Sequence, residues 1–188
     1  CIRFLENSDF FDSSLKDQIL KAVTLLEKKT NKSFSGENSD LLLVSVRSGA
    51  KFSMPGMMDT ILNLGLNDHR TQILAEQTNP DFAYNCYRRL LQMFADVVYG
   101  IPKELFDTLL ENFEKNQNKC LKELSIAEYQ DLVKQYKEIY HNENQNFPEN
   151  PIDQLYAAIQ AVFKSWNNNR AKIYRDLNHI SHDLGTAV

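Results

Sequence analysis

The sequence predicts an α+β fold in which α-helices predominate. Apolar residues recur at helical spacings of three and four over residues 14–29 and again over residues 152–166. The run LLLVSV at residues 41–46 is short, largely apolar and rich in branched side chains, as expected of a strand that is buried on both faces. Beyond residue 79, prolines stand where helices commonly begin. These observations predict a small strand-containing part and a larger helical part.

The composition is that of a soluble globular protein: of 188 residues, 43% are hydrophobic and 24% are charged. No apolar run approaches the length that crosses a bilayer, so we expect no membrane partner. The formal net charge of −4 argues against nucleic acid as a partner and restricts any anion site to a few local arginines. Three cysteines without a short paired spacing indicate a reducing intracellular compartment, cytoplasmic or organellar. His179 and His182 lack a third ligand at a suitable spacing, so no metal site is predicted.

The N-terminal third is expected to hold one helix and one strand. Residues 12–14, DSS, offer N-caps for a helix over residues 14–29, and the polar tract at residues 31–40 ends it. The predicted strand follows this tract. After it, residues 61–68, ILNLGLND, are predicted to form a short helical turn that Gly65 stops.

The remainder is expected to be helical. Prolines mark three helix starts, at Asn79-Pro80, Ile101-Pro102 and Asn150-Pro151. Ser125 and Glu128 form a capping-box pattern, and the polar tract at residues 141–150 is typical of a loop. We therefore divide the chain into a strand-containing part (residues 1–66), an inserted helical lobe (67–149) and a helical return segment (150–188).

Arg47, at the exit of the predicted strand, is the first candidate for a binding residue. A strand end is where α/β folds present side chains to ligands, and the guanidinium fork suits phosphate oxygens. The alternative is an arginine paired with a carboxylate at a domain edge. The pattern alone leaves both open.

The segment that follows, SGAKFSMPGMMDT at residues 48–60, has the composition of an anion-binding loop. Its small residues can expose successive backbone N–H groups, and Lys51 adds positive charge. Gly56 after Pro55 suits the second corner of a type II turn, where φ is positive. The Gly-Lys-Ser/Thr of the Walker pattern does not follow.

The methionines and the aspartate of this segment also bear on its role. Met54, Met57 and Met58 have two interpretations: they either cover a flat ligand or pack in the core. Asp59, beside Thr60, is expected to cap the short turn after it.

Two further arginine pairs occur in helical sequence. Arg88 and Arg89 point about 100° apart on a helix, so only one of them can face inward. Arg170 and Arg175 can share a helix face, and solvent exposure is expected for both.

Three stretches resemble the N-terminal nucleotide-binding domain of the pyruvate, phosphate dikinase family. They are LLLVSVRSGAKFSMPGMMDTILNLGLND at residues 41–68, FAYNCYRRLLQMFADVVYGI at 82–101 and AVFKSWNNNRAKIYRDLNHISHDLGTAV at 161–188. The related phosphoenolpyruvate synthases share the valine-arginine-serine strand exit without the Pro-Gly-Met-Met-Asp-Thr turn. The turn therefore favours the dikinase family.

The resemblance implies a partial ATP-grasp nucleotide-binding domain with an inserted helical lobe. In the family, ATP, phosphate and pyruvate are converted to AMP, pyrophosphate and phosphoenolpyruvate through a phosphohistidine, with Mg²⁺ supporting the nucleotide step. The implied partners are ATP, phosphate, and the phosphohistidine domain and pyruvate-binding barrel of the same longer chain, which would form a homodimer.

The resemblance also implies roles for individual residues. Arg47 and Arg89 would be catalytic, acting on the nucleotide phosphates. The implied nucleotide-binding set is Arg47, Lys51, Ser53, Gly56, Met57, Met58, Asp59, Thr60 and Arg89.

The family's upstream lysine-bearing segment, its Mg²⁺ ligands and its adenine-binding segment have no counterpart here, so we expect a fragment that is inactive alone. The alternatives are a nucleotide domain like that of phosphoenolpyruvate synthase, and a non-catalytic helical interaction module.

Overall fold

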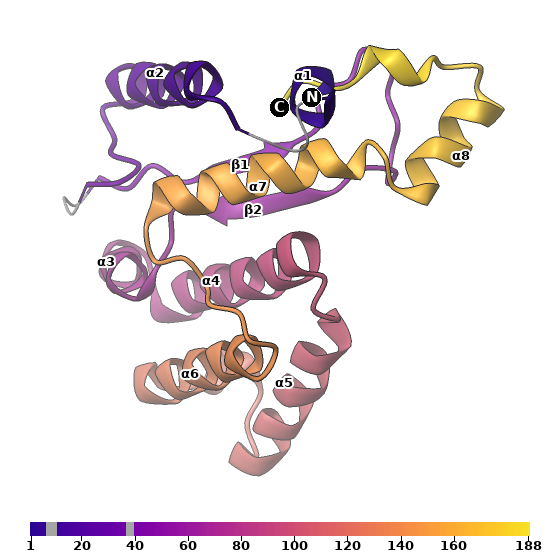
Figure 1. Ribbon diagram of the computed structural model, residues 1–188. Coiled ribbons are helices and arrows are strands. Elements are labelled where there is room, and N and C mark those ends of the chain that lie inside the picture. Colours follow the sequence, from indigo (N-terminus) through magenta and orange to yellow (C-terminus); the bar gives the residue numbers. More distant parts are fainter. Residues whose placement is uncertain (7–10, 37–39) are drawn as a thin grey trace.

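Helices dominate the computed structural model, which describes residues 1–6, 11–36 and 40–188 (Figure 1). In chain order the elements are α1 (Ile2–Glu6), α2 (Ser13–Thr30), β1 (Val44–Arg47), β2 (Thr60–Leu64), α3 (Asp68–Gln77), α4 (Pro80–Phe94), the π-helix η1 (Ala95–Tyr99), α5 (Lys103–Gln117), the 3₁₀-helix η2 (Leu121–Glu123), α6 (Ile126–Asn142), α7 (Pro151–Ser165), α8 (Asn169–Leu177) and the 3₁₀-helix η3 (His182–Leu184). The predicted α+β class with a helical majority is confirmed. Part of the polar tract at residues 31–40 lies outside the described residues. Within the described ranges, no helix combines the length and apolar character needed to cross a membrane.

Helix starts follow the capping signals in the sequence. The Asp12 side chain accepts a hydrogen bond from a backbone N–H of the first turn of α2, so this helix begins where predicted. Asn79 and Asn150 cap α4 and α7 in the same way, each ahead of a proline at the first helical position. Ser125 and Glu128 form the predicted capping box at the start of α6.

The two strands pair antiparallel, and this pairing overturns the predicted helical turn over residues 61–68. An apolar pentapeptide such as TILNL fits either a strand or a helical turn, and the hydrogen-bonding partner offered by β1 decides between them. The prediction that β1 is buried on both faces is also wrong. Val46 is buried, whereas Ser45 and Arg47 are exposed, because the small sheet is covered on one face only.

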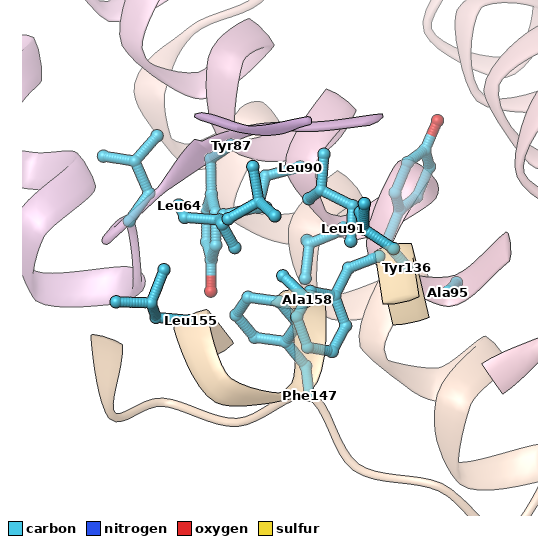
Figure 2. Close-up of a cluster of buried hydrophobic side chains, with 14 of the residues drawn as sticks. Leu64, Tyr87, Leu90, Leu91, Ala95, Tyr136, Phe147, Leu155 and Ala158 are labelled. Atoms are coloured by element: carbon cyan, nitrogen blue, oxygen red, sulfur yellow. The ribbon is translucent and has the colours of Figure 1, made fainter. Parts of the chain in front are cut away.

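Helix α7 runs along the sheet and contacts both strands, while α4 packs against β2 (Figure 1). Helices α3 to α6 lie together on the opposite side of the sheet and α7 from α2 (Figure 1). Figure 2 shows apolar side chains from β2, α4, α6 and α7 meeting in one buried cluster. The labelled members are Leu64, Tyr87, Leu90, Leu91, Ala95, Tyr136, Phe147, Leu155 and Ala158. Burial of each large apolar side chain contributes about 1.5–3 kcal/mol. This shared core holds α4 and α6 against β2 and α7.

The two ends of the segment 67–149 lie at one place, beside Gln154. The fully buried Gln154 of α7 donates hydrogen bonds from Nε2 to the carbonyl oxygens of Leu66 (2.8 Å) and Pro148 (2.9 Å). Its Oε1 accepts one from the Gly65 N–H (2.9 Å). Asn67 adds a bond to the Glu149 carbonyl (3.0 Å). The two chain connections are thus fixed side by side.

Candidate functional site

Arg47 occupies the last position of β1 and is exposed to solvent. The strand register sets it opposite Thr60, the first residue of β2. The intervening segment, residues 48–59 and called the loop below, therefore leaves and returns to the sheet beside this arginine.

The arginines of the chain divide into two groups. Those with a hydrogen bond or ion pair are Arg3, Arg70, Arg88, Arg170 and Arg175. The side chains of Arg47 and Arg89 make neither a hydrogen bond nor an ion pair with any residue that the structure describes. The carboxylate partner considered for Arg47 is thus not found in the described part. An exposed guanidinium without a protein acceptor keeps its five N–H donors available to a ligand.

The loop surrounds a hollow of about 530 Å³. Of the predicted site residues, those that line it are Arg47, Lys51, Ser53, Gly56, Met58 and Thr60. Met57, Asp59 and Arg89 do not line it. On the outgoing side of the loop, residues 50–52 make no hydrogen bond to any described residue. Their backbone N–H groups are available to an anion.

The tip of the loop is the predicted turn. The Met57 N–H donates to the Met54 carbonyl (3.1 Å), and Gly56 at the second corner has φ of 71°. No atom lies within 4 Å of a Cβ built on Gly56, so backbone conformation, and not space, requires glycine there. Met54 and Met58 are buried, so core packing is their role in this structure.

The returning side of the loop is bonded to the corner between α7 and α8. The Asp59 carboxylate pairs with Arg170 (2.9 Å), and its N–H donates to the Ser165 hydroxyl (3.3 Å). Asn168 donates to the Met57 carbonyl (3.2 Å). The prediction that Asp59 caps a helical turn is wrong, because a strand follows it and its carboxylate is engaged by Arg170.

A second carboxylate lies near this ion pair. Asp96, in the π-helix, has its pKa raised, first by burial and then by the negative charge of Asp59. Lys103 and Arg170 act in the opposite direction on the pKa of Asp96. The positive charge of Arg170 therefore acts on both carboxylates, directly on Asp59 through the ion pair and through space on Asp96.

Arg88 and Arg89 point in different directions, as the helical geometry requires. Arg88 is half-buried and donates to Asn85 (2.9 Å) and to the Tyr136 hydroxyl (3.3 Å), inside the helical lobe. Arg89 is exposed. No contact brings Arg89 together with Arg47 among the described residues.

Arg175 contradicts the expected solvent exposure. It is fully buried, and its guanidinium lies over the Trp166 ring, 4.0 Å from the centroid. Its Nη1 donates to the Trp166 carbonyl (2.6 Å), and its Nε donates to Nδ1 of His182 (2.9 Å). Burial lowers the pKa of Arg175. His182 thus accepts a hydrogen bond from the buried arginine of this corner. Within the described ranges, no group of three potential metal ligands occurs.

Several of these residues escaped prediction from sequence. Gln154 and Arg70 are polar side chains that the fold buries, and no local pattern marks them. Asn168 and Ser165 bind the loop across more than 100 positions of sequence. The one signal in the sequence is that asparagine is a common N-cap residue, and Asn168 does cap α8.

Comparison with known proteins matches residues 5–188 to the family model described as "Pyruvate phosphate dikinase, AMP/ATP-binding domain". The chain is 43% identical over 192 residues to pyruvate, phosphate dikinase of Clostridium symbiosum, covering all of this chain and 22% of that protein. It is 45% identical over 191 residues to that of Giardia intestinalis, covering all of this chain and 21% of the relative. It is also 46% identical over 176 residues to the chloroplastic pyruvate, phosphate dikinase 1 of Arabidopsis thaliana, covering 93% of this chain and 18% of the relative. The chain thus spans about a fifth of the length of these curated relatives.

Proposed function

Because this chain belongs to the family of pyruvate phosphate dikinase AMP/ATP-binding domains, we propose that Arg47 and the loop bind the phosphate groups of ATP. One observation carries the proposal: the Arg47 side chain has no partner among the described residues and lines the same hollow as residues 50–52, whose backbone N–H groups make no hydrogen bond to a described residue. These are the donors that phosphate oxygens accept from most strongly.

The proposed chemistry is phosphoryl transfer supported by position and charge. Arg47 holds phosphate oxygens through charge-assisted hydrogen bonds, and Lys51 adds a mobile positive charge on the outgoing side of the loop. Gly56 and its neighbours cover the phosphates. Arg89 acts on the phosphates from the helical lobe. Such groups stabilise the charge that spreads over the transferred phosphoryl group without exchanging protons.

We assign this chain to part of an ATP-grasp domain, with residues 67–149 inserted as a helical lobe. The bonds of Gln154 and Asn67, which hold the two ends of the lobe together, support this division. They are what an insertion requires, since the surrounding sheet and α7 must close on either side of it.

The longer protein that contains this sequence converts ATP, phosphate and pyruvate to AMP, pyrophosphate and phosphoenolpyruvate through a phosphohistidine. It does so inside the cell, as a homodimer, with the phosphohistidine domain and pyruvate barrel on the same chain. Mg²⁺ accompanies the nucleotide in this proposal, but the described residues contain no group of three potential metal ligands. The part played by Arg47 and the loop is to bind and orient the phosphate groups.

Isothermal titration of the full-length protein with ATP–Mg²⁺ tests the proposal. Arg47→Ala is expected to weaken ATP binding by roughly tenfold to a hundredfold, since hydrogen bonds to charged groups contribute about 1.5–3 kcal/mol. Arg89→Ala tests the second arginine separately. Arg3→Ala, which removes an exposed arginine paired with Asp12, is the matched control and is expected to leave binding unchanged. Full ATP affinity and histidine phosphorylation in the Arg47→Ala variant would contradict the site.

Neither alternative, a nucleotide domain like that of phosphoenolpyruvate synthase or a non-catalytic helical interaction module, is favoured. The reported relatives carry the name of the dikinase, and Arg47 lacks the carboxylate partner that a purely structural role would give it among the described residues.

A further inference from the structure

The two sides of the loop are held very differently. On the outgoing side, the Gly49 N–H donates to the Ala187 carbonyl (2.8 Å) and the Ser53 carbonyl accepts from the Tyr174 hydroxyl (3.4 Å), but residues 50–52 between them make no hydrogen bond to a described residue. On the returning side, three bonds tie two residues to the corner between α7 and α8: Met57 is bonded through its carbonyl, and Asp59 through both its N–H and its carboxylate. Met58, between them, is buried.

The corner offers these bonds from a short stretch, residues 165–170. Ser165 accepts from Asp59 while its own hydroxyl donates to the Val162 carbonyl (2.8 Å). Asn168 donates to Met57 with Nδ2 and, with its oxygen, caps α8 by accepting from the Ala171 N–H (2.8 Å). Both side chains are therefore fixed by their own helix before they reach the loop.

The corner is itself rigid. Between Ser165 and Asn168 the chain carries Trp166, whose ring is 1% exposed and packs against the buried guanidinium of Arg175. The Trp166 Nε1–H donates to the His182 carbonyl (3.0 Å), which ties the corner to the C-terminal segment. A rigid support of this kind can hold a bonded segment in one place.

We propose that Arg170 is a positioning residue for the phosphate-binding loop, and that Asp59 acts by holding the loop on Arg170 instead of contacting the nucleotide. This inference rests on the proposed function. It corrects the role that resemblance assigned to Asp59, since the Asp59 carboxylate is already engaged and Asp59 does not line the hollow. The fixed returning side sets the position of Thr60 opposite Arg47, and residues 50–52 of the outgoing side, which make no hydrogen bond to a described residue, are left to close on phosphate.

The charges around Arg170 explain why its loss would displace the loop. Arg170 pairs directly with Asp59, and its charge also opposes the effect of Asp59 on the pKa of Asp96. Without the guanidinium, the Asp59 carboxylate loses its ion pair to α8 and the repulsion between the two negative charges is less balanced.

The experiment uses the full-length protein and four forms: Arg170→Ala, Asp59→Asn, the reciprocal exchange Asp59→Arg with Arg170→Asp, and Lys172→Ala. Lys172 is an exposed basic residue of the same helix without a side-chain partner among the described residues, which makes it the matched control. Two kinds of measurement are made: the hydrogen exchange of the amides at residues 53–59 without nucleotide, and the interaction with ATP, given by its affinity and its KM.

Arg170→Ala is expected to accelerate amide exchange at residues 53–59 and to weaken ATP binding roughly fivefold, the upper range for an ion pair of this exposure. The KM for ATP rises while kcat changes less, because the loop is misplaced and Arg47 is intact. Lys172→Ala changes neither quantity, and the reciprocal exchange recovers most of both.

Two results would overturn the inference. One is unchanged exchange and affinity in Arg170→Ala while Arg47→Ala loses ATP binding. The other is a loss of affinity in Asp59→Asn that the reciprocal exchange does not recover, which would make Asp59 a nucleotide ligand. If Arg47→Ala keeps full affinity, the proposed function fails instead, and the exchange measurement still tests the positioning role because it needs no nucleotide.

Discussion

Replacement of Gln154 by methionine tests how the helical lobe is joined to the sheet. The side chain of Gln154 is fully buried and makes three hydrogen bonds to backbone groups, two as donor and one as acceptor. Methionine has a similar length and volume, so the substitution removes the hydrogen bonds and leaves little cavity. The backbone groups of Gly65, Leu66 and Pro148 then lose their partners.

The expected loss of stability follows from those three groups. An unsatisfied buried donor or acceptor costs about 1–3 kcal/mol, and partial relaxation brings the sum to about 3–5 kcal/mol. For a chain of this length each kcal/mol lowers Tm by about 2–4 °C, so a decrease on the order of 10 °C is expected. Urea unfolding, followed by the fluorescence of Trp166, the one tryptophan of the sequence, measures the loss in the free energy of unfolding directly.

The matched control is Gln160→Met, on the same helix. Gln160 is half-buried and makes no side-chain hydrogen bond to a described residue, so the control is expected to change stability by less than about 1 kcal/mol. A loss of stability in Gln154→Met no larger than that of the control would refute the reasoning.

Gln154→Glu adds a test of the pH dependence of stability. The introduced carboxylate would face two carbonyl oxygens, which raises its pKa in the folded state. This variant is therefore expected to be least unstable at low pH and to lose stability as the pH rises through the raised pKa.

Three further predictions concern single residues. Gly65→Ala is expected to cost about 1–3 kcal/mol, since φ is +105° and the new Cβ would lie 3.1 Å from a backbone oxygen; an unchanged urea midpoint would contradict it. The pKa of Glu128 is lowered to about 2 by the hydrogen bond from Lys119 and then by the capping box, so its contribution to stability is present above pH 4.5 and is lost as the pH falls toward 2. Titration by NMR should find that low pKa and its rise in Lys119→Ala; an ordinary value in both forms would contradict the pairing. Arg175→Ala should destabilise the chain by about 3 kcal/mol and shift the emission of Trp166, because a desolvated cation–π contact and a charge-assisted hydrogen bond are lost. A loss below about 1 kcal/mol with unaltered emission would count against it.

The local parts of the fold were readable from sequence. The caps at Asp12, Asn79, Ser125 and Asn150 involve residues within one turn of each other, so the pattern contains both partners of each bond. The same is true of the turn at Gly56, where proline and glycine set the backbone angles by themselves. Strand β2 was missed because its partner lies on a different segment of the chain.

In the candidate site, too, some features follow from local sequence and others only from tertiary packing. The sequence by itself determined Arg47 as the candidate, the composition of the loop and the type of its turn, because these depend on residue type and local backbone geometry. Only the tertiary structure decided that Arg47 is unpaired in the described part while Arg175 is buried against Trp166, and that Asp59 is held by Arg170. Asp59 and Arg170 lie 111 positions apart, and their 2.9 Å contact exists only because α7 packs along the sheet and delivers the corner to the loop. Short-range geometry is contained in short stretches of sequence, whereas the partner of a long, charged side chain is chosen by packing.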